Sequence, residues 1–71
     1  MTNDEAKKLY DNGIDAYRAG EYDQALDALT QARDLYNRAG NQTGEAEALN
    51  DAGVVCIQME QWDSAREHLL A

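Results

Sequence analysis

One cysteine and one histidine are the side chains of this chain best suited to nucleophilic or metal chemistry. Cys56 and His68 lie twelve residues apart, whereas two ligands on one helical face stand three or four residues apart, and the pair matches no nucleophile motif. We expect Cys56 to pack in the interior as a small apolar residue and His68 to lie on the surface. The residue types therefore predict no catalytic residue, no metal site, no cofactor and no enzyme.

The run Asp11-Asn12-Gly13-Ile14-Asp15 has the residue types of a calcium-binding loop. The bidentate glutamate that completes such a loop is missing, and the apolar spacing around the run is helical. We therefore reject a calcium site here.

Charge narrows the class of partner. Fourteen acidic and six basic residues give 71 residues a formal net charge of -8, whereas a nucleic-acid partner requires a basic surface. The simplest interpretation is a solvated acidic surface, and a basic peptide ligand is the alternative. One cysteine forms no intrachain disulfide, and no apolar run approaches the roughly 20 residues that span a bilayer, so we expect a cytoplasmic chain with no membrane partner.

The elements that must position any site are predicted to be helices, because the chain contains no proline and few β-branched residues. Apolar residues recur at intervals of three and four in four segments. The first segment runs from Thr2 to near Gly20, and the second runs from Tyr22 to Arg38-Ala39-Gly40. The third runs from Ala46 to Ile57, and the fourth from Trp62 to Ala71. Thr2 and Glu5 have capping-box spacing, Thr43 is expected as the N-cap after a polar loop over 41–44, and a turn is expected at Glu60-Gln61.

The chain also repeats itself after forty residues. The equivalent pairs are Ala6 and Ala46, Leu9 and Leu49, Gly13 and Gly53, Tyr22 and Trp62, Asp23 and Asp63, Ala25 and Ala65, and Leu29 and Leu69. A fixed period of this length is typical of stacked helical repeats. The equivalence of Tyr22 and Trp62 predicts that both pack inside a helical hairpin and are not exposed recognition residues.

The run from Leu9 to Leu26 resembles the tetratricopeptide repeat signature, and the period of forty is similar to the extended variants of that repeat. The resemblance implies an all-α fold, a right-handed α-solenoid fragment that forms one domain over 1–71. The domain is expected to contain two helix-turn-helix repeats, at about 4–39 and about 44–71, of which the second is truncated. Gly13, Ala25 and Ala32 are expected to let paired helices approach closely. Gly20 suits the turn, and Glu60 stands in its place in the second repeat.

A second stripe on the first helix of each repeat is where the resemblance places a concave binding groove. The residues expected to contact a partner are Lys7, Tyr10, Ile14, Tyr17, Asn50, Val54, Ile57 and Gln58. Asp11 and Asp51 add negative charge beside them, so we expect a scaffold that binds a hydrophobic or basic segment of a protein or peptide. The alternative is that these residues only pack the two first helices together.

Two repeats without a cap lead to a second hypothesis about function. Each unit of a solenoid covers the apolar face of its neighbour, and Leu69 and Leu70 lie near the unfinished edge of the second repeat. The chain is therefore also predicted to self-associate, either as a homo-oligomer or as a dimer that exchanges helices.

Overall fold

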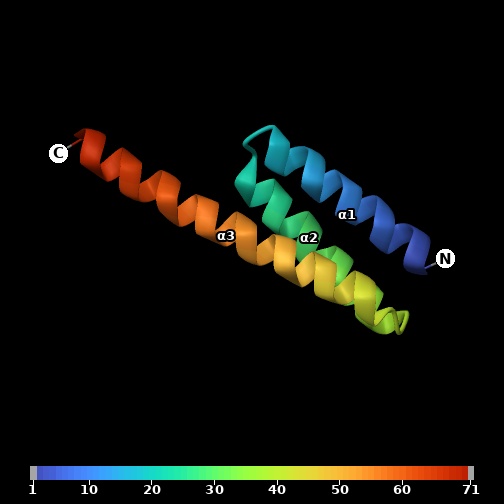
Figure 1. Ribbon diagram of the computed structural model, residues 1–71. Helices are drawn as coiled ribbons and strands as arrows, with labels where there is room; N and C mark the ends of the chain where they lie inside the picture. The colour runs from blue at the N-terminus through green and yellow to red at the C-terminus, as the bar shows by residue number, and fades with distance from the viewer. Residues whose placement is uncertain (1, 71) are drawn as a thin grey trace.

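A computed structural model of the chain describes the backbone of residues 2–70 and the side chains of residues 3–61. It contains three helices, α1 (Thr2–Arg18), α2 (Tyr22–Arg38) and α3 (Gln42–Leu70), shown in Figure 1. Within residues 2–70 there is no strand. The predicted all-α class is confirmed.

Both turns between helices have the same backbone geometry. Gly20 and Gly40 follow the first two helices with φ of +79° and +74°. At the first turn the N–H of Gly20 donates to the carbonyl of Tyr17, and the N–H of Glu21 donates to the carbonyl of Ala16. These are the two bonds of a Schellman motif, and the same pair recurs at Gly40. Glycine takes this left-handed conformation without steric cost, so the predicted turn at Gly20 is confirmed.

The N-cap of α3 is Asn41. Its Oδ1 accepts a hydrogen bond from the backbone N–H of Gly44 at 2.9 Å, the usual bond of an N-cap side chain. The predictions of a loop over 41–44 and of a cap at Thr43 are wrong, because α3 already begins at Gln42. Both residue types can cap a helix, and the turn at Gly40 decides between them by fixing where the chain can start a new helix.

Helix α3 runs without a break through Glu60 and Gln61, where a turn and a fourth helix were predicted. The first two turns both need a residue with positive φ, and glutamate is disfavoured there while it favours a helix. The predicted turn is therefore wrong, and α3 extends beyond the α1–α2 hairpin in Figure 1. The predicted packing of Trp62 and the predicted surface positions of His68, Leu69 and Leu70 lie outside the residues whose side chains are described.

The core forms along α2, which packs against both other helices, whereas α1 and α3 barely meet. Its two clusters of buried residues are Ala6, Ala32, Tyr36 and Ala48, and Ala25, Leu29 and Val55. Alanine dominates because its small side chain allows the helices to lie close together. The predicted interior positions of Ala25 and Ala32 are confirmed, since neither has exposed surface.

Two glycines mark the closest approaches between helices. A Cβ atom added to Gly13 would lie 2.8 Å from Cγ of Leu29, and one added to Gly44 would lie 2.5 Å from the ring of Tyr36. The predicted steric role of Gly13 is confirmed. Tyr22 also packs as predicted, because it lies against the Leu29 cluster with its ring centroid 5.7 Å from that of Tyr17.

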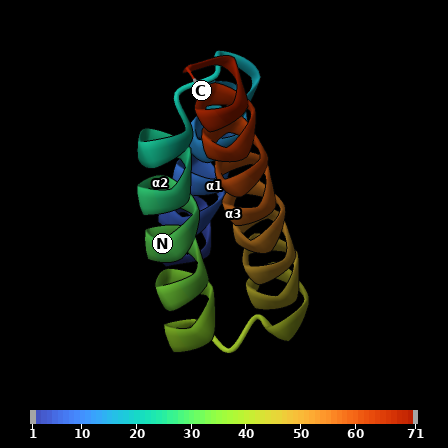
Figure 2. The same cartoon turned by 90° about the vertical axis from the view of Figure 1, so that its left-hand side faces the viewer.

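The three helices make an elongated body of 49 × 18 × 12 Å. Figure 2 shows α2 and α3 running alongside one another with α1 behind them. This arrangement leaves α3 with two kinds of exposed side: one bordering α1, and one facing away from the hairpin.

Candidate partner-binding groove

The first exposed side of α3 forms a groove with α1. An open hollow of about 620 Å³ is lined by Tyr10, Asp11, Ile14, Asp15, Arg18 and Asp51. A smaller pocket of about 60 Å³ is lined by Ile14, Tyr17, Leu29, Asp51, Val54 and Val55. We call the hollow and the pocket together the α1–α3 groove. It brings together four of the residues predicted to contact a partner: Tyr10, Ile14, Tyr17 and Val54.

The other four predicted contact residues lie elsewhere. Lys7, Asn50 and Ile57 are exposed and Gln58 is half-buried, and none of them lines the hollow or the pocket. Asn50, Ile57 and Gln58 stand three or four positions from Val54, and Lys7 stands three positions before Tyr10, so each lies about one helical turn along its helix from a residue of the groove. Their role in binding stays a prediction.

Asp15 lines the groove, although in the sequence it was considered only as part of the rejected calcium-like run. Asp15 lies one helical turn after Asp11, so the two carboxylates share a face of α1 and both border the open hollow. The spacing of these two acids was the signal that could have identified Asp15.

A hydrogen bond joins the two walls of the groove. The hydroxyl of Tyr10 on α1 donates to Oδ2 of Asp51 on α3. This bond, followed by burial and by the negative charge of Asp51, raises the pKa of Tyr10 to about 12. Because the phenol must stay protonated to donate, the bond is intact at neutral pH.

The groove is apolar at one end and acidic at the other. Ile14, Tyr17 and Val54 supply apolar surface, while Asp11, Asp15 and Asp51 place three carboxylates around the open hollow against the single guanidinium of Arg18. An anionic ligand would meet net repulsion there, whereas a cationic one would be attracted.

Tyr10, Ile14 and Tyr17 have a structural role as well. All three pack against the cluster built on Ala25, Leu29 and Val55, as the packing alternative predicted. They remain only partly buried, so each also presents surface to the groove. Packing and ligand contact are therefore compatible for these side chains.

The second exposed side of α3 consists of Ala46, Leu49, Gly53 and Cys56, which we call the open face. All four are exposed, with 54% of Leu49 accessible. Their equivalents forty residues earlier are Ala6, Leu9, Gly13 and Ala16, and α2 covers these because the α1–α2 turn folds it back onto α1. Since α3 does not turn at Glu60, no such cover forms over the open face within the described side chains, and the predicted interior position of Cys56 is wrong.

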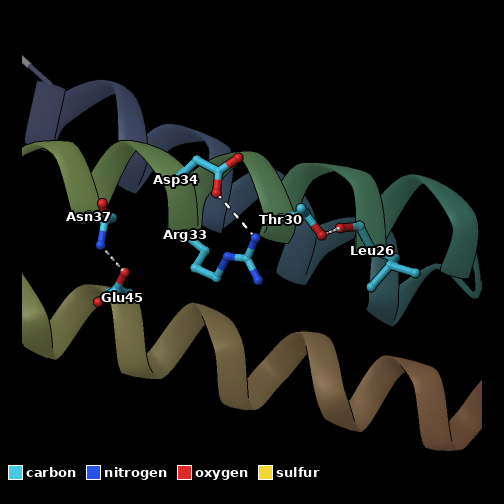
Figure 3. A network of polar contacts seen from close by, with 6 residues as sticks. All are labelled: Leu26, Thr30, Arg33, Asp34, Asn37 and Glu45. Atoms are coloured by element: carbon cyan, nitrogen blue, oxygen red, sulfur yellow. Dashed lines mark hydrogen bonds and ion pairs between the residues drawn. The ribbon is translucent and has the colours of Figure 1, made fainter.

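A polar cleft of about 520 Å³ lies between α2 and the start of the open face. It is lined by Arg33, Asp34, Asn37, Gln42, Glu45, Ala46 and Leu49. Figure 3 shows Nδ2 of Asn37 donating to Oε2 of Glu45 at 2.6 Å across the two helices, and Arg33 paired with Asp34 at 3.2 Å within α2. The first contact holds α3 against α2, and the second pairs two charges of the cleft with each other, so the cleft is a weaker candidate for a binding site than the groove.

The described residues contain neither a cluster suited to a metal ion nor a helix suited to a membrane. No group of three or more His, Cys, Asp or Glu side chains there is arranged to hold a metal ion. No helix in the described part of the chain is long and apolar enough to cross a membrane.

Comparison with known proteins identifies one similarity. A family model described as tetratricopeptide repeat matches residues 4–70, a span that contains both walls of the groove and the open face. Neither a curated protein nor a solved structure matches the chain.

Proposed function

The chain belongs to the tetratricopeptide repeat family, and from this premise we propose that the α1–α3 groove binds a segment of a partner protein. Tetratricopeptide repeats generally mediate protein–protein interactions, and the family is typically a non-enzymatic scaffold. Fold alone does not assign a site. The groove is proposed because Tyr10, Tyr17 and Val54 present apolar surface beside an acidic hollow.

The carboxylates of the groove support a hydrophobic or basic partner segment. Asp11, Asp15 and Asp51 outnumber Arg18 in the open hollow, and the chain as a whole carries a net charge of -8. The same charge disfavours nucleic acid as a partner. We further propose that the chain acts in the cytoplasm, where its single exposed thiol, Cys56, would stay reduced.

Titration of the ¹⁵N-labelled chain with three synthetic peptides of equal length tests this proposal. Their sequences alternate leucine with lysine, with serine or with glutamate. We expect the lysine peptide to bind most tightly and the glutamate peptide least, with amide shifts centred on Ile14, Tyr17 and Val54. Tighter binding of the glutamate peptide, or shifts confined to the open face, would contradict the proposal.

Two matched variants separate the groove from the overall charge. Asp15→Asn removes one charge inside the groove, and Asp27→Asn removes one from an exposed mid-helix position of α2. Because an exposed pair contributes up to about 1 kcal/mol, we expect Asp15→Asn to weaken binding of the lysine peptide by about two- to fivefold. Equal weakening by Asp27→Asn would mean that the peptide responds only to net charge.

The open face supports a second candidate function, self-association of the chain. Leu49 in this face is 54% exposed, and Ile57, next to Cys56 in the chain, is 55% exposed, and a second copy could bury this apolar surface. Sedimentation velocity from 10 to about 500 µM tests it, with Leu49→Glu as the variant. A monomer at every concentration would refute self-association. The helix-exchanged form of the dimer stays a prediction, because it depends on side chains of residues 62–71, outside the described part.

A further inference from the structure

The pocket and the hollow of the α1–α3 groove share two wall residues. Ile14 and Asp51 border both. A side chain entering the pocket and a side chain entering the hollow would therefore lie next to each other on the same ligand. This adjacency defines what kind of segment fits the groove.

The size and the lining of the pocket suit an aliphatic side chain. A cavity of 150 Å³ accommodates a benzene ring, whereas a single water needs about 10–15 Å³. The pocket, at about 60 Å³, lies between these limits. Ile14, Leu29 and Val54 make most of its wall apolar, so a leucine, isoleucine or methionine side chain fits its chemistry as well as its volume.

Asp51 makes the neighbouring hollow suitable for a cation. Its Oδ2 atom accepts the hydroxyl of Tyr10, and its Oδ1 atom has no partner among the described residues. The hydrogen bond from Tyr10 holds the carboxylate in place at the boundary between the pocket and the hollow. Asp11 and Asp15 lie on the opposite wall of the hollow, so three carboxylates on α1 and α3, against the one guanidinium of Arg18, favour a cation beside Asp51.

An arginine uses this arrangement better than a lysine does. Its guanidinium presents several donors in one plane and can bond to carboxylates on two sides, whereas a lysine ammonium acts as a point charge. The open hollow, at about 620 Å³, has room for the long side chain.

We propose that the groove recognises a partner segment in which an aliphatic side chain stands directly beside an arginine. The aliphatic side chain fills the pocket between Ile14 and Val54, and the guanidinium binds Asp51. This inference rests on the first proposed function, partner binding in the groove, and is independent of self-association through the open face.

Four synthetic peptides test the two halves of the recognition site. They share one neutral background and differ at a central pair of residues: Leu-Arg, Ala-Arg, Trp-Arg and Leu-Gln. We expect the Leu-Arg peptide to bind most tightly in a ¹⁵N titration. Binding should weaken about tenfold for Ala-Arg, which leaves the pocket empty, and by a similar factor for Trp-Arg, which is too large for it. Leu-Gln should weaken binding about fivefold.

A double-mutant cycle then tests whether the arginine acts through Asp51. We expect Asp51→Asn to weaken binding of Leu-Arg about fivefold and to leave Leu-Gln unchanged, because an asparagine can still accept the bond from Tyr10. The control Asp27→Asn should affect neither peptide. Circular dichroism checks that both variants keep the helicity of the parent chain.

The outcomes distinguish this inference from the proposed function. If all four peptides bind the groove with equal affinity, or if Asp51→Asn weakens Leu-Arg and Leu-Gln alike, the aliphatic–arginine inference is refuted while binding in the groove stands. If none of the peptides shifts an amide of the groove at millimolar concentration, both are refuted.

Discussion

The glycines Gly13 and Gly53 are equivalent in the forty-residue repeat but lie in opposite environments, so changing each to alanine gives the most direct test of this fold. A Cβ atom at Gly13 would lie 2.8 Å from Cγ and 2.9 Å from Cδ2 of Leu29, and 3.3 Å from the carbonyl oxygen of Ala25. A Cβ atom at Gly53 would meet no described atom within 4 Å. The sequence treats the two positions as the same, whereas the structure predicts effects of opposite sign.

The magnitudes follow from two opposing terms. Replacing glycine by alanine inside a helix stabilises the fold by about 0.5 to 1 kcal/mol. At Gly13 this gain is outweighed, because Leu29 is completely buried and overpacking costs about 1 to 3 kcal/mol. We therefore expect Gly13→Ala to lower the free energy of unfolding by about 1 kcal/mol, and Gly53→Ala to raise it by about 0.5 to 1 kcal/mol.

Urea unfolding followed by circular dichroism measures both changes. With a slope of about 1 kcal/mol/M for a small domain, the midpoint should fall by about 1 M for Gly13→Ala and rise by about 0.5 to 1 M for Gly53→Ala. If Gly53→Ala destabilises the chain as much as Gly13→Ala does at a concentration where sedimentation velocity shows a monomer, then a helix of the same chain covers Gly53, and the description of α3 as one continuous helix is refuted.

Three further predictions concern the turn, the core and the groove. Glu60→Gly supplies the residue type that both Schellman turns use, so we expect α3 to break there. The part of α3 after the break could then fold back over the open face, and the covered thiol of Cys56 should react more slowly with a disulfide reagent. Glu60→Ala is the control, and its thiol should react as fast as that of the parent chain. Gly44→Ala drives a Cβ into the ring of Tyr36 and should lower the urea midpoint by about 1 M, a result that an unchanged midpoint would contradict. The pKa of Tyr10 is raised in the folded chain from 10.0 to about 12, so the stabilisation that the protonated phenol contributes is complete below pH 10 and is lost as the pH rises through 12. The urea midpoints at pH 9 and pH 11 should therefore differ more for the parent chain than for Tyr10→Phe. An equal difference in the two chains would exclude this linkage.

The parts of the fold that could be predicted from sequence are those decided by neighbouring residues. The apolar stripes of α1 and α2, the turn at Gly20 and the steric role of Gly13 follow from spacing and from residue size. The turn at Glu60 was predicted because Trp62 is the equivalent of Tyr22 in the forty-residue repeat, which puts Glu60 in the place of Gly20. Periodicity alone cannot distinguish two helices in a hairpin from one continuous helix. The residue at the turn decides, and glutamate lacks the freedom of Gly20 and Gly40 to take a positive φ.

The predicted exposure of a residue depends on a partner element more than on its own type. Cys56 has the environment of a core residue only if a fourth helix folds back over α3, so the error at Glu60 produced the error at Cys56. The groove depends on the same kind of information. Tyr10 and Asp51 are 41 residues apart, and only the packing of α2 against both α1 and α3 brings them together, which a helical pattern does not specify.

The bond between Tyr10 and Asp51 also links ligand binding to the ionisation of the groove. An arginine bound beside Asp51 places a positive charge near the phenol, and this charge favours the phenolate. By linkage, a ligand that binds more tightly to the phenolate form must lower the pKa of Tyr10. The phenolate absorbance of Tyr10 is measured as the difference between the parent chain and Tyr10→Phe. With the Leu-Arg peptide bound, we expect this absorbance to report a pKa below 12. With the Leu-Gln peptide, the pKa of Tyr10 should stay near the value of the free chain. A lowered pKa with both peptides would mean that the arginine does not act at Asp51, because only a charge close to the carboxylate can distinguish the two ligands.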